Sequence, residues 1–260
     1  RLGMFKGVIY TALKMVVYKI TTKLVDHVFT INNDGLNICK DLGFKSVSKI
    51  PLGMDKNIFK ISKVSGDIVR KKLALDGMVF SYIGRMIEGK GVHILLEALA
   101  KIKQYKWTLI LDNFEIYGKS NYHHKIRKLI TQLDLKDRII FFNADHNEIS
   151  GYMNAANVVI VPSITTLSFK EQYGRVAPES MACGCLVITS DSGALPELVD
   201  RFGWIFEEGD AEELARLLVK AINLDSVHDI GRDASKYAHQ FLSVNAQAKA
   251  MINIFRELNV

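Results

Sequence analysis

Short runs of β-branched and aromatic residues alternate with longer amphipathic segments along most of this chain of 260 residues. Strands are expected at 79–83, 108–111, 139–142, 158–161, 186–189 and 203–206, and helices at 92–105, 122–133, 147–156 and 210–222. Near-continuous apolar strands separated by helices are typical of a parallel sheet covered on both faces. The pattern therefore predicts an α/β fold built on a doubly wound, Rossmann-like parallel sheet.

The same pattern divides the chain into four parts. Residues 1–50 differ in kind, with two helix-like segments and short strands expected at 27–31 and 46–50. Residues 51–64 open with the Pro- and Gly-containing PLGMDKNIF and are predicted to be a linker. The Rossmann-like domain is expected over 65–225. Two further helices, at about 226–242 and 244–258, are expected to make up the last part, 226–260.

Composition excludes several classes of protein. The three cysteines, Cys39, Cys183 and Cys185, have neither the number for a disulfide framework nor the spacing of a zinc site. A reduced, cytoplasmic setting is therefore expected, with Cys183 and Cys185 packed rather than reactive. The net charge of +6 is modest, and the basic residues are not interleaved with aromatic residues. Nucleic acid is therefore not an expected partner.

Residues 1–24 are apolar and basic, with five Lys or Arg side chains and no acid. Lys14 interrupts the apolar run well short of the roughly 20 residues that a membrane span needs. No small-residue cleavage site follows, which argues against a signal peptide. Two interpretations stay open: a basic helix in peripheral contact with an anionic membrane surface, or a packed helix with a solvated basic face.

The loop after the predicted strand 79–83 reads GRMIEGKG. It nearly matches a P-loop, but Gly91 stands where a P-loop needs Ser or Thr to hold magnesium, which argues against an NTPase. What is left is a glycine-containing loop that carries Arg85 and Lys90 into the N-terminus of a helix. Such a loop is suited to a diphosphate, and the alternative is an exposed basic turn.

The loop after the predicted strand 158–161 contains Glu171 and Glu179, with Gly174 between them. A carboxylate at position 179 can accept two hydrogen bonds from a vicinal diol such as ribose. Backbone N–H groups around residues 174–176 can meet phosphate oxygens, because glycine allows close approach. The alternative for two such glutamates is ordinary surface charge.

Two smaller predictions concern helices. Pro178 and Glu179 are expected to open a short helix that Gly184 closes, with proline at the start and glycine just past the end. His123 and His124 lie in a polar helical segment and are expected to be solvated.

Taken together, the motifs resemble glycosyltransferase family 4, whose members are retaining enzymes with the GT-B fold. They occur in the family's order: Gly84-Arg85…Lys90-Gly91, Pro162-Ser163, Glu171…Glu179, Met181-Ala182-Cys183-Gly184 and Gly193-Ala194-Leu195-Pro196-Glu197. The resemblance covers nearly the whole chain from about residue 25. It implies the C-terminal, donor-binding half of a GT-B fold, preceded in residues 1–50 by the tail of the acceptor-side domain.

The resemblance also implies a role for each residue. Arg85 and Lys90 would bind the donor diphosphate and stabilise the negative charge that builds on it as the glycosidic bond breaks. Glu179 would hold the ribose hydroxyls, and Glu171 would lie near the transferred sugar. The remaining donor-binding positions implied are Gly84, Gly174, Arg175 and Val176.

The expected activity is transfer of a hexose or other sugar from an α-linked nucleotide sugar, of the UDP or GDP type, to an acceptor hydroxyl with retention. The acceptor is expected to be a glycan or lipid-linked, in cell-envelope polysaccharide or glycolipid synthesis at the cytoplasmic face of the inner membrane. No two aspartates stand two residues apart, so the DxD metal motif is missing and neither a metal nor a further cofactor is expected.

Other functions stay open at this point. The residues before the linker are too few for the family's first domain, so the chain is expected to be a fragment or to work without a conventional acceptor domain. A module that binds nucleotide sugar without transferring it is the main alternative. A related GT-B epimerase or phosphorylase is a third, which the family 4 motifs disfavour.

Overall fold

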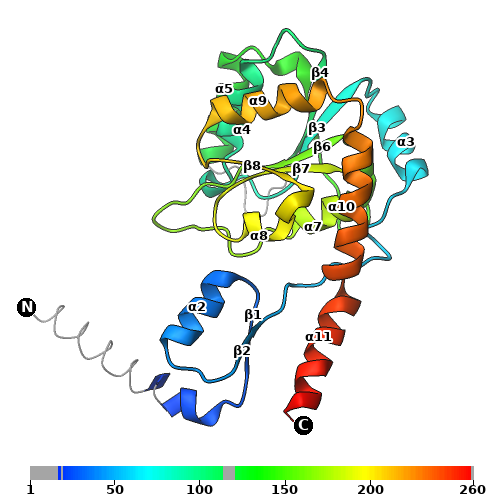
Figure 1. The fold of residues 1–260 in the computed structure, drawn as a ribbon. Coiled ribbons are helices and arrows are strands. Elements are labelled where there is room, and N and C mark those ends of the chain that lie inside the picture. Colours follow the sequence, from blue (N-terminus) through cyan, green and yellow to red (C-terminus); the bar gives the residue numbers. More distant parts are fainter. Residues whose placement is uncertain (1–16, 19, 114–120, 259–260) are drawn as a thin grey trace, which may run out of the picture. The chain divides into compact units, whose positions relative to one another are not determined.

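The computed structural model describes residues 17–18, 20–113 and 121–258 (Figure 1). The chain forms two compact units. Unit 1 is Arg1–Pro51 together with Ala250–Val260, and unit 2 is Leu52–Lys249. The last helix, α11 (Val244–Glu257), is divided between the two units.

Unit 2 is built on one sheet of six strands, in the order β5-β4-β3-β6-β7-β8, in which every neighbouring pair is parallel. The bounds are β3 (Met78–Tyr82), β4 (Trp107–Asp112), β5 (Ile139–Phe142), β6 (Val158–Val161), β7 (Leu186–Ser190) and β8 (Trp204–Phe206). The order runs outward in opposite directions from β3 and β6. The predicted doubly wound α/β sheet is confirmed, with its switch point between these two strands.

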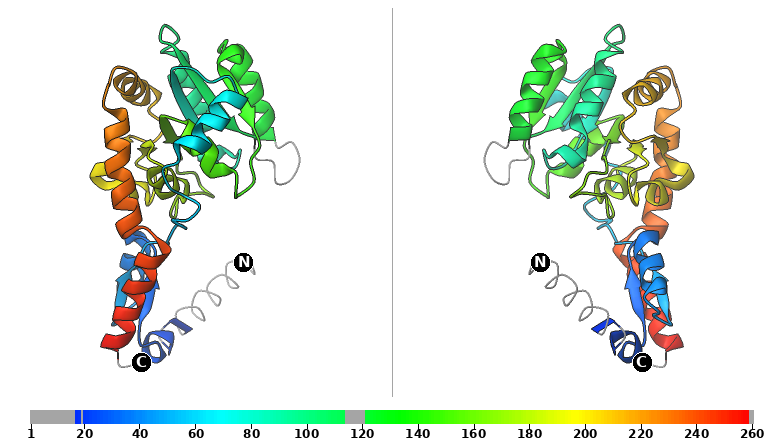
Figure 2. Two further views of the ribbon diagram at one scale, coloured as in Figure 1. Left: turned by 90° about the vertical axis from the view of Figure 1, so that its right-hand side faces the viewer. Right: turned by 90° about the vertical axis from the view of Figure 1, so that its left-hand side faces the viewer.

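Helices lie on both faces of this sheet (Figures 1 and 2). One core joins the sheet to α4 (Val92–Ala100), α5 (Asn121–Gln132) and α9 (Ala211–Ile222). The other joins it to α3 (Lys63–Lys72), α6 (Ile149–Ala155), α7 (Val176–Ala182), α8 (Leu195–Val199) and α10 (Val227–Phe241). Within β3, Phe80 belongs to the first core and its neighbour Val79 to the second. Because both faces are buried, the strands read as continuous apolar runs.

Short polar contacts fix where several helices begin. The Ser62 hydroxyl accepts from the backbone N–H of Ser65 at the start of α3, and the Asp210 carboxylate accepts from that of Glu213 at the start of α9. Such N-caps satisfy N–H groups that have no partner inside the helix. The described residues of unit 2 also form three short 3₁₀ helices, η1 (Glu88–Lys90), η2 (Lys136–Arg138) and η3 (Asp200–Phe202).

The helix predicted over 92–105 is shorter than expected, because α4 ends at Ala100. Beyond Ala100, side-chain N–H groups, rather than N–H groups of a continuing helix, donate to the backbone carbonyls. The Trp107 indole donates to Ile102 O, and the Arg138 guanidinium donates to the carbonyls of Lys103 and Tyr105. These tertiary contacts hold residues 101–105 as turns.

The helix predicted to open at Pro178 begins two residues earlier, at Val176. The carbonyl of Gly174 accepts from Ala177 N, which starts the first turn before the proline. Pro178 is still within that turn, where a missing N–H costs no intrahelical bond. The expected end holds: Cys183 is the C-cap, and Gly184 follows with a φ of 83°.

The expectation that His123 is solvated is wrong. Its side chain is 2% exposed, and its Nε2 lies 2.9 Å from Asn113 Oδ1. His123 occupies the inner side of α5 beside the apolar Ile126 and Ile130, which are also buried. His124, its neighbour, is exposed as expected.

The segment predicted as a linker is partly held by hydrogen bonds. Met54 N donates to Leu242 O, and Val244 N donates to Met54 O, in a parallel bridge at the junction of α10 and α11. A Cβ on Gly53 would lie 2.3 Å from Val244 Cα, so only glycine allows this approach. Helix α3 then begins at Lys63, close to the predicted end of the linker.

Unit 1 contains a small parallel pair, β1 (Val28–Thr30) and β2 (Val47–Lys49), connected by α2 (Asn33–Asp41). The Asn32 side chain accepts from Gly35 N and caps α2. The rings of Phe29 and Phe255 meet edge to face, with centroids 5.6 Å apart. Most of the predicted basic segment 1–24 lies outside the described residues. No helix among the described residues has the length and apolar character to cross a membrane.

Candidate functional site

Both loops that the sequence singled out leave the sheet at its switch point. The chain segment after β3 runs through residues 83–91, and the segment after β6 runs through 162–175. In a parallel sheet, both begin at the carboxyl ends of their strands, on the same edge. Ligands of open α/β sheets bind in the crevice that such a switch point creates.

The first loop has a fixed backbone. Gly84 has a φ of 142°, and its N–H donates to Asp112 Oδ2 at the end of β4. The buried Tyr82 hydroxyl donates to Arg85 O at 2.7 Å. Gly91, with a φ of 65°, leads directly into α4. These contacts hold the loop between β3 and α4 at both of its ends.

Glycines allow the loops after β3 and β6 to pack tightly against each other. A Cβ on Gly91 would lie 1.7 Å from Pro162 O, and one on Gly89 would lie 2.3 Å from the Phe169 ring. Ile164 N donates to Gly89 O across the same gap. These distances are too short for any real side chain. The motif glycines are therefore required for loop packing as well as for access to a ligand.

Lys90 and Glu171 meet at this junction. Lys90 Nζ lies 2.5 Å from Glu171 Oε2, and the Ser163 hydroxyl donates to the same oxygen at 2.9 Å. The side chains of Lys90 and Glu171 are 18% and 8% exposed. Lys90 Nζ also lies 5.4 Å from the centroid of the Phe169 ring, within cation–π distance. A mostly buried cation and carboxylate thus share one spot at the switch point.

The Glu171 backbone is held as firmly as its side chain. Its carbonyl accepts from Ala194 N in the loop after β7, and a Cβ on Gly193 would lie 1.9 Å from that carbonyl oxygen. Gly174, with a φ of 77°, brings its backbone close to the Glu171 side chain. Three loops therefore converge on Glu171.

Glu179 lies in a second group, on α7. Its Oε1 is 3.2 Å from Arg175 NH2, one helical turn earlier. The Glu179 side chain is 10% exposed, whereas that of Arg175 is 62% exposed. Burial raises the pKa of Glu179 to about 7, and Arg175 offsets part of that rise. A carboxyl group that is half protonated near neutral pH is a common feature of functional sites.

The structure thus places the predicted residues in separate groups. It brings Lys90, Glu171 and Gly174 together. It also pairs Arg175, the residue before Val176 opens α7, with Glu179 one turn later. The Arg85 side chain is exposed and forms no ion pair with any described residue. In the described part of the chain, no three His, Cys, Asp or Glu side chains gather as a potential metal site.

Four residues in the site had no role assigned from sequence: Tyr82, Asp112, Ser163 and Phe169. Asp112 and Tyr82 are the last residues of neighbouring strands, so their position at the carboxyl edge was a usable signal. Ser163 was part of a motif, but its bond to Glu171 depends on the loop fold. Nothing in the sequence indicated that Phe169 covers Gly89.

A further layer of contacts joins the outer loops. Thr165 donates to the Glu208 carboxylate through both its N–H and its hydroxyl, and the hydroxyl lies 3.2 Å from Ser192 Oγ. Glu208 N in turn donates to Asp191 Oδ1. The loops after β6, β7 and β8 therefore support one another beside the site.

Cys183 and Cys185 are buried next to Met153, and burial raises the pKa of both thiols. The prediction that these residues pack in the interior is confirmed. A thiol with a raised pKa is also a poor nucleophile at neutral pH.

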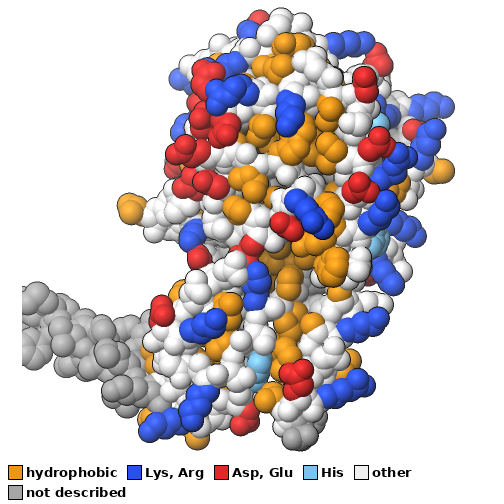
Figure 3. All heavy atoms as spheres, in the orientation of Figure 1, with side chains coloured by type: hydrophobic (Ala, Val, Ile, Leu, Met, Phe, Trp, Pro, Cys, Tyr) orange, Lys and Arg blue, Asp and Glu red, His pale blue; other side chains and the backbone are white. Residues whose placement is uncertain are grey.

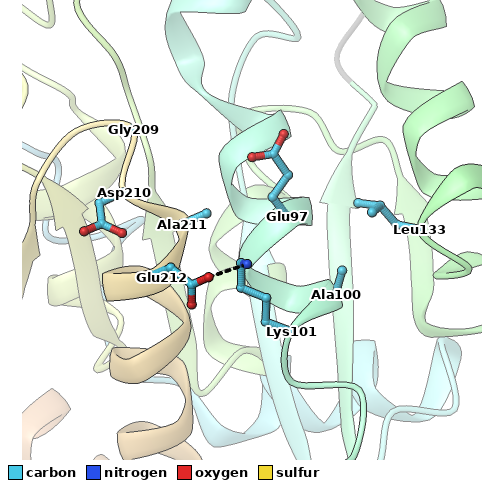
Figure 4. Close-up of a pocket in the computed structure, with 8 residues that line it drawn as sticks. All are labelled: Glu97, Ala100, Lys101, Leu133, Gly209, Asp210, Ala211 and Glu212. Carbon is cyan, nitrogen blue, oxygen red and sulfur yellow. Dashed lines mark hydrogen bonds and ion pairs between the residues drawn. The ribbon is translucent and has the colours of Figure 1, made fainter.

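A hollow between α4 and α9 lies outside these groups (Figure 4). Glu97, Lys101 and Leu133 line one side of it, and Asp210 and Glu212 the other. Lys101 Nζ lies 2.5 Å from Glu212 Oε1, with both side chains well exposed. Exposed pairs of this kind contribute little, and none of the candidate donor-site residues lines the hollow.

The fold and site define a Rossmann-like unit with a cation-bearing loop at its switch point. The family "Glycosyl transferases group 1" matches residues 67–241, and the chain belongs to this family. The amylovoran biosynthesis glycosyltransferase AmsK of Erwinia amylovora is 29% identical over 53% of this chain and 34% of its own length. The capsular polysaccharide biosynthesis glycosyltransferase CapM of Staphylococcus aureus is 26% identical over 92% of this chain and 61% of its own.

Solved structures agree on the fold. Anabaena Alr3699/HepE, crystallised in complex with UDP, matches with a TM-score of 0.81 at 24% identity, over 94% of this chain and 68% of that one. This likeness confirms the expected C-terminal half of a GT-B fold. The chain spans about half or less of the length of several curated relatives that it matches.

Proposed function

We propose that unit 2 binds a nucleotide sugar and that the whole enzyme transfers the sugar to an acceptor hydroxyl with retention of configuration. The observation that carries this proposal is the Lys90–Glu171 pair, held by three interlocked loops at the switch point of the sheet. It joins a cation for a diphosphate to a carboxylate for a sugar in a single, mostly buried location.

Lys90 and Arg85 have complementary tasks in this proposal. In the absence of donor, Lys90 forms an ion pair with Glu171. When the donor binds, its diphosphate is a second anion for the Lys90 ammonium group. Arg85 is exposed and unpaired among the described residues, so it is free to turn toward the same phosphates. As the glycosidic bond breaks, negative charge grows on the diphosphate, and two preorganised cations stabilise that charge. These cations supply the charge that a metal ion supplies in other glycosyltransferases.

Glu171 and Glu179 bind the other two parts of the donor, the transferred sugar and the ribose. Glu171 lies next to Lys90, where it can orient the sugar or support a cationic ring while Ser163 holds its rotamer. Glu179 accepts two hydrogen bonds from the ribose hydroxyls, with backbone contacts from residues 174–176. Because the ionised form accepts both bonds, donor affinity increases as the pH rises through the Glu179 pKa of about 7.

UDP is the first donor to test, since the similar Anabaena protein was crystallised with UDP and with UDP-glucose, and GDP is the second. AmsK and CapM are named for amylovoran and capsular polysaccharide synthesis. A glycan or lipid-linked acceptor of the cell envelope, used at the cytoplasmic face of the inner membrane, is the corresponding proposal for this chain.

Arg85→Ala and Lys90→Ala test the mechanism in an enzyme that includes the acceptor-side domain. Each should lower turnover about 100-fold or more while weakening donor binding less, because the charge they stabilise is largest in the transition state. Lys128→Ala, on the exposed side of α5, is the matched control. Equal losses in binding and turnover would reduce both residues to simple binding groups. Activity should persist in a chelator, and a strict need for manganese or magnesium would contradict the metal-free mechanism.

The alternative function, a binding module without transfer, predicts a different result for the chain alone. Transfer requires the acceptor hydroxyl to be held against the sugar in near-attack geometry. We expect the chain to bind donor but release little nucleoside diphosphate in the presence of acceptors. Rapid, acceptor-dependent release would show that these 260 residues suffice.

A further inference from the structure

Helix α3 of unit 2 has two apolar sides, and only one is packed. On the packed side, a Cβ at Gly66 would lie 2.5 Å from Asn154 O of α6, so the two helices are in close contact. On the other side Val64 and Ile68 are 73% and 61% exposed. These two residues are one helical turn apart. Ile61 precedes the helix and lies against Gly184, but it is still 52% exposed. Val64 and Ile68 therefore form an exposed aliphatic row, with Ile61 near its N-terminal end.

Lysines surround this row. Lys60 and Lys63 flank Ile61, while Lys71 and Lys72 lie one turn after Ile68, and all four are exposed. None of the four forms an ion pair with a described residue. Asp67 is the only acid in residues 60–73. Figure 3 shows Lys and Arg side chains gathered on the side of unit 2 where α3 lies in Figure 1.

We propose that this surface, residues 60–72, docks on an anionic lipid surface. The aliphatic row would enter the headgroup region, and the lysines would extend their charged ends to lipid phosphates while their stems cover apolar surface. A helix with an apolar row and a basic border is the pattern of interfacial membrane contact. The proposal is independent of the donor site and of the basic segment 1–24.

The chemistry of the surface favours lipid over other partners. Lysine is depleted in the centres of protein–protein interfaces, whereas four lysines border this row closely. Nucleic-acid surfaces without sequence preference combine basic grooves with aromatic stacking platforms, and Ile61, Val64 and Ile68 offer no ring for stacking. Anionic lipid matches both the positive charge and the aliphatic row.

Binding of the purified chain to lipid vesicles tests the contribution of the lysines to the proposed docking surface. Vesicles of phosphatidylcholine and phosphatidylglycerol in equal parts should retain the chain at low salt and release it at high salt. Each lysine at such a surface contributes about fivefold in affinity, so Lys71→Gln with Lys72→Gln should reduce binding about 25-fold. The charge-matched control, Lys128→Gln with Lys136→Gln, removes two exposed lysines elsewhere in unit 2 and should leave binding nearly unchanged.

A local probe separates α3 from other membrane-binding segments. In a Cys39→Ser background, an environment-sensitive fluorophore is attached to Val64→Cys or, as control, to Lys128→Cys. Cys183 and Cys185 are buried and do not compete for the label. On addition of anionic vesicles, emission should shift to the blue at position 64 and stay unchanged at position 128.

Three outcomes would overturn the proposal. One is failure of the chain to bind anionic vesicles. Another is binding with no change at position 64, which would assign the membrane contact to a different segment. The third is self-association without vesicles that Val64→Ser with Ile68→Ser abolishes, which would make the row an interface between copies of this chain.

Discussion

The two units of this chain bury their side chains very differently. In unit 2, every residue of β6 and β7 is buried, and apolar cores lie on both faces of the sheet. In unit 1, α2 contains no buried residue, and Thr30 is the only buried residue of β1 and β2. A two-stranded sheet is marginal by itself in water. We infer that the stability of the chain, like its proposed donor chemistry, resides in unit 2.

Core substitutions should give the largest difference between the units. Leu109 is fully buried in β4, so Leu109→Ala should lower the free energy of unfolding by about 2–5 kcal/mol. Ile38, on α2 of unit 1, is 58% exposed, and Ile38→Ala should change the free energy of unfolding by about 0.5 kcal/mol or less. Denaturant unfolding followed by far-ultraviolet circular dichroism, which reports on the helices of both units, measures both. Similar effects at the two positions would contradict the comparison.

A pair of glycines sharpens the comparison. Gly91 and Gly43 both have a positive φ, but a Cβ at Gly91 would strike Pro162 O, while one at Gly43 meets nothing within 4 Å. Gly43→Ala should cost only the backbone strain, about 1 kcal/mol. Gly91→Ala should cost about 2–3 kcal/mol and also weaken nucleotide binding, because the loops after β3 and β6 must separate. Normal binding by Gly91→Ala would show that the interlocked loops are not needed for the site.

The pH dependence of stability tests a single buried carboxyl group of unit 2. The pKa of Glu179 is raised by burial to about 7 from 4.5, so the fold prefers the protonated form. This group therefore contributes a stability that is present below about pH 4.5 and is lost as the pH rises toward 7. The loss is on the order of 3 kcal/mol.

Glu179→Gln isolates that effect. The variant should lack this part of the pH dependence and be more stable than the wild type above about pH 7. Unfolding free energies of both proteins, compared across the range, cancel the contributions of other groups. A difference that does not change with pH would mean that the Glu179 carboxyl titrates normally.

The sequence predicted the parts of this molecule that depend on local pattern. The six strands of unit 2 were predicted because burial on both faces leaves continuous apolar runs such as 158–161. The loop at 84–91 was predicted because glycines and cations stood where a strand ended. The pairing of Lys90 with Glu171 was not predicted, since it arises from the packing of Gly89 and Gly91 against a loop far along the chain.

Other errors share this cause. The early end of α4 depends on Arg138, which bonds to carbonyls more than 30 residues before it. His123 lies in a segment rich in polar residues, yet the helix turns it inward. The burial that raises the pKa of Glu179 depends on the packing of α7, which no local pattern reveals. Local signals thus defined the elements, and contacts distant in sequence defined the site.

We propose above all that unit 2 holds a nucleoside diphosphate through Glu179 and the loops at the switch point. Isothermal titration of UDP and of GDP into the wild type and Glu179→Ala, at about pH 8 where the carboxyl is ionised, tests it most directly. We predict saturable binding of at least one nucleotide and a loss of binding free energy of about 1.5–3 kcal/mol in the variant, roughly 10- to 150-fold in affinity. Equal affinities in the two proteins, or no binding of either nucleotide by the wild type, would contradict it.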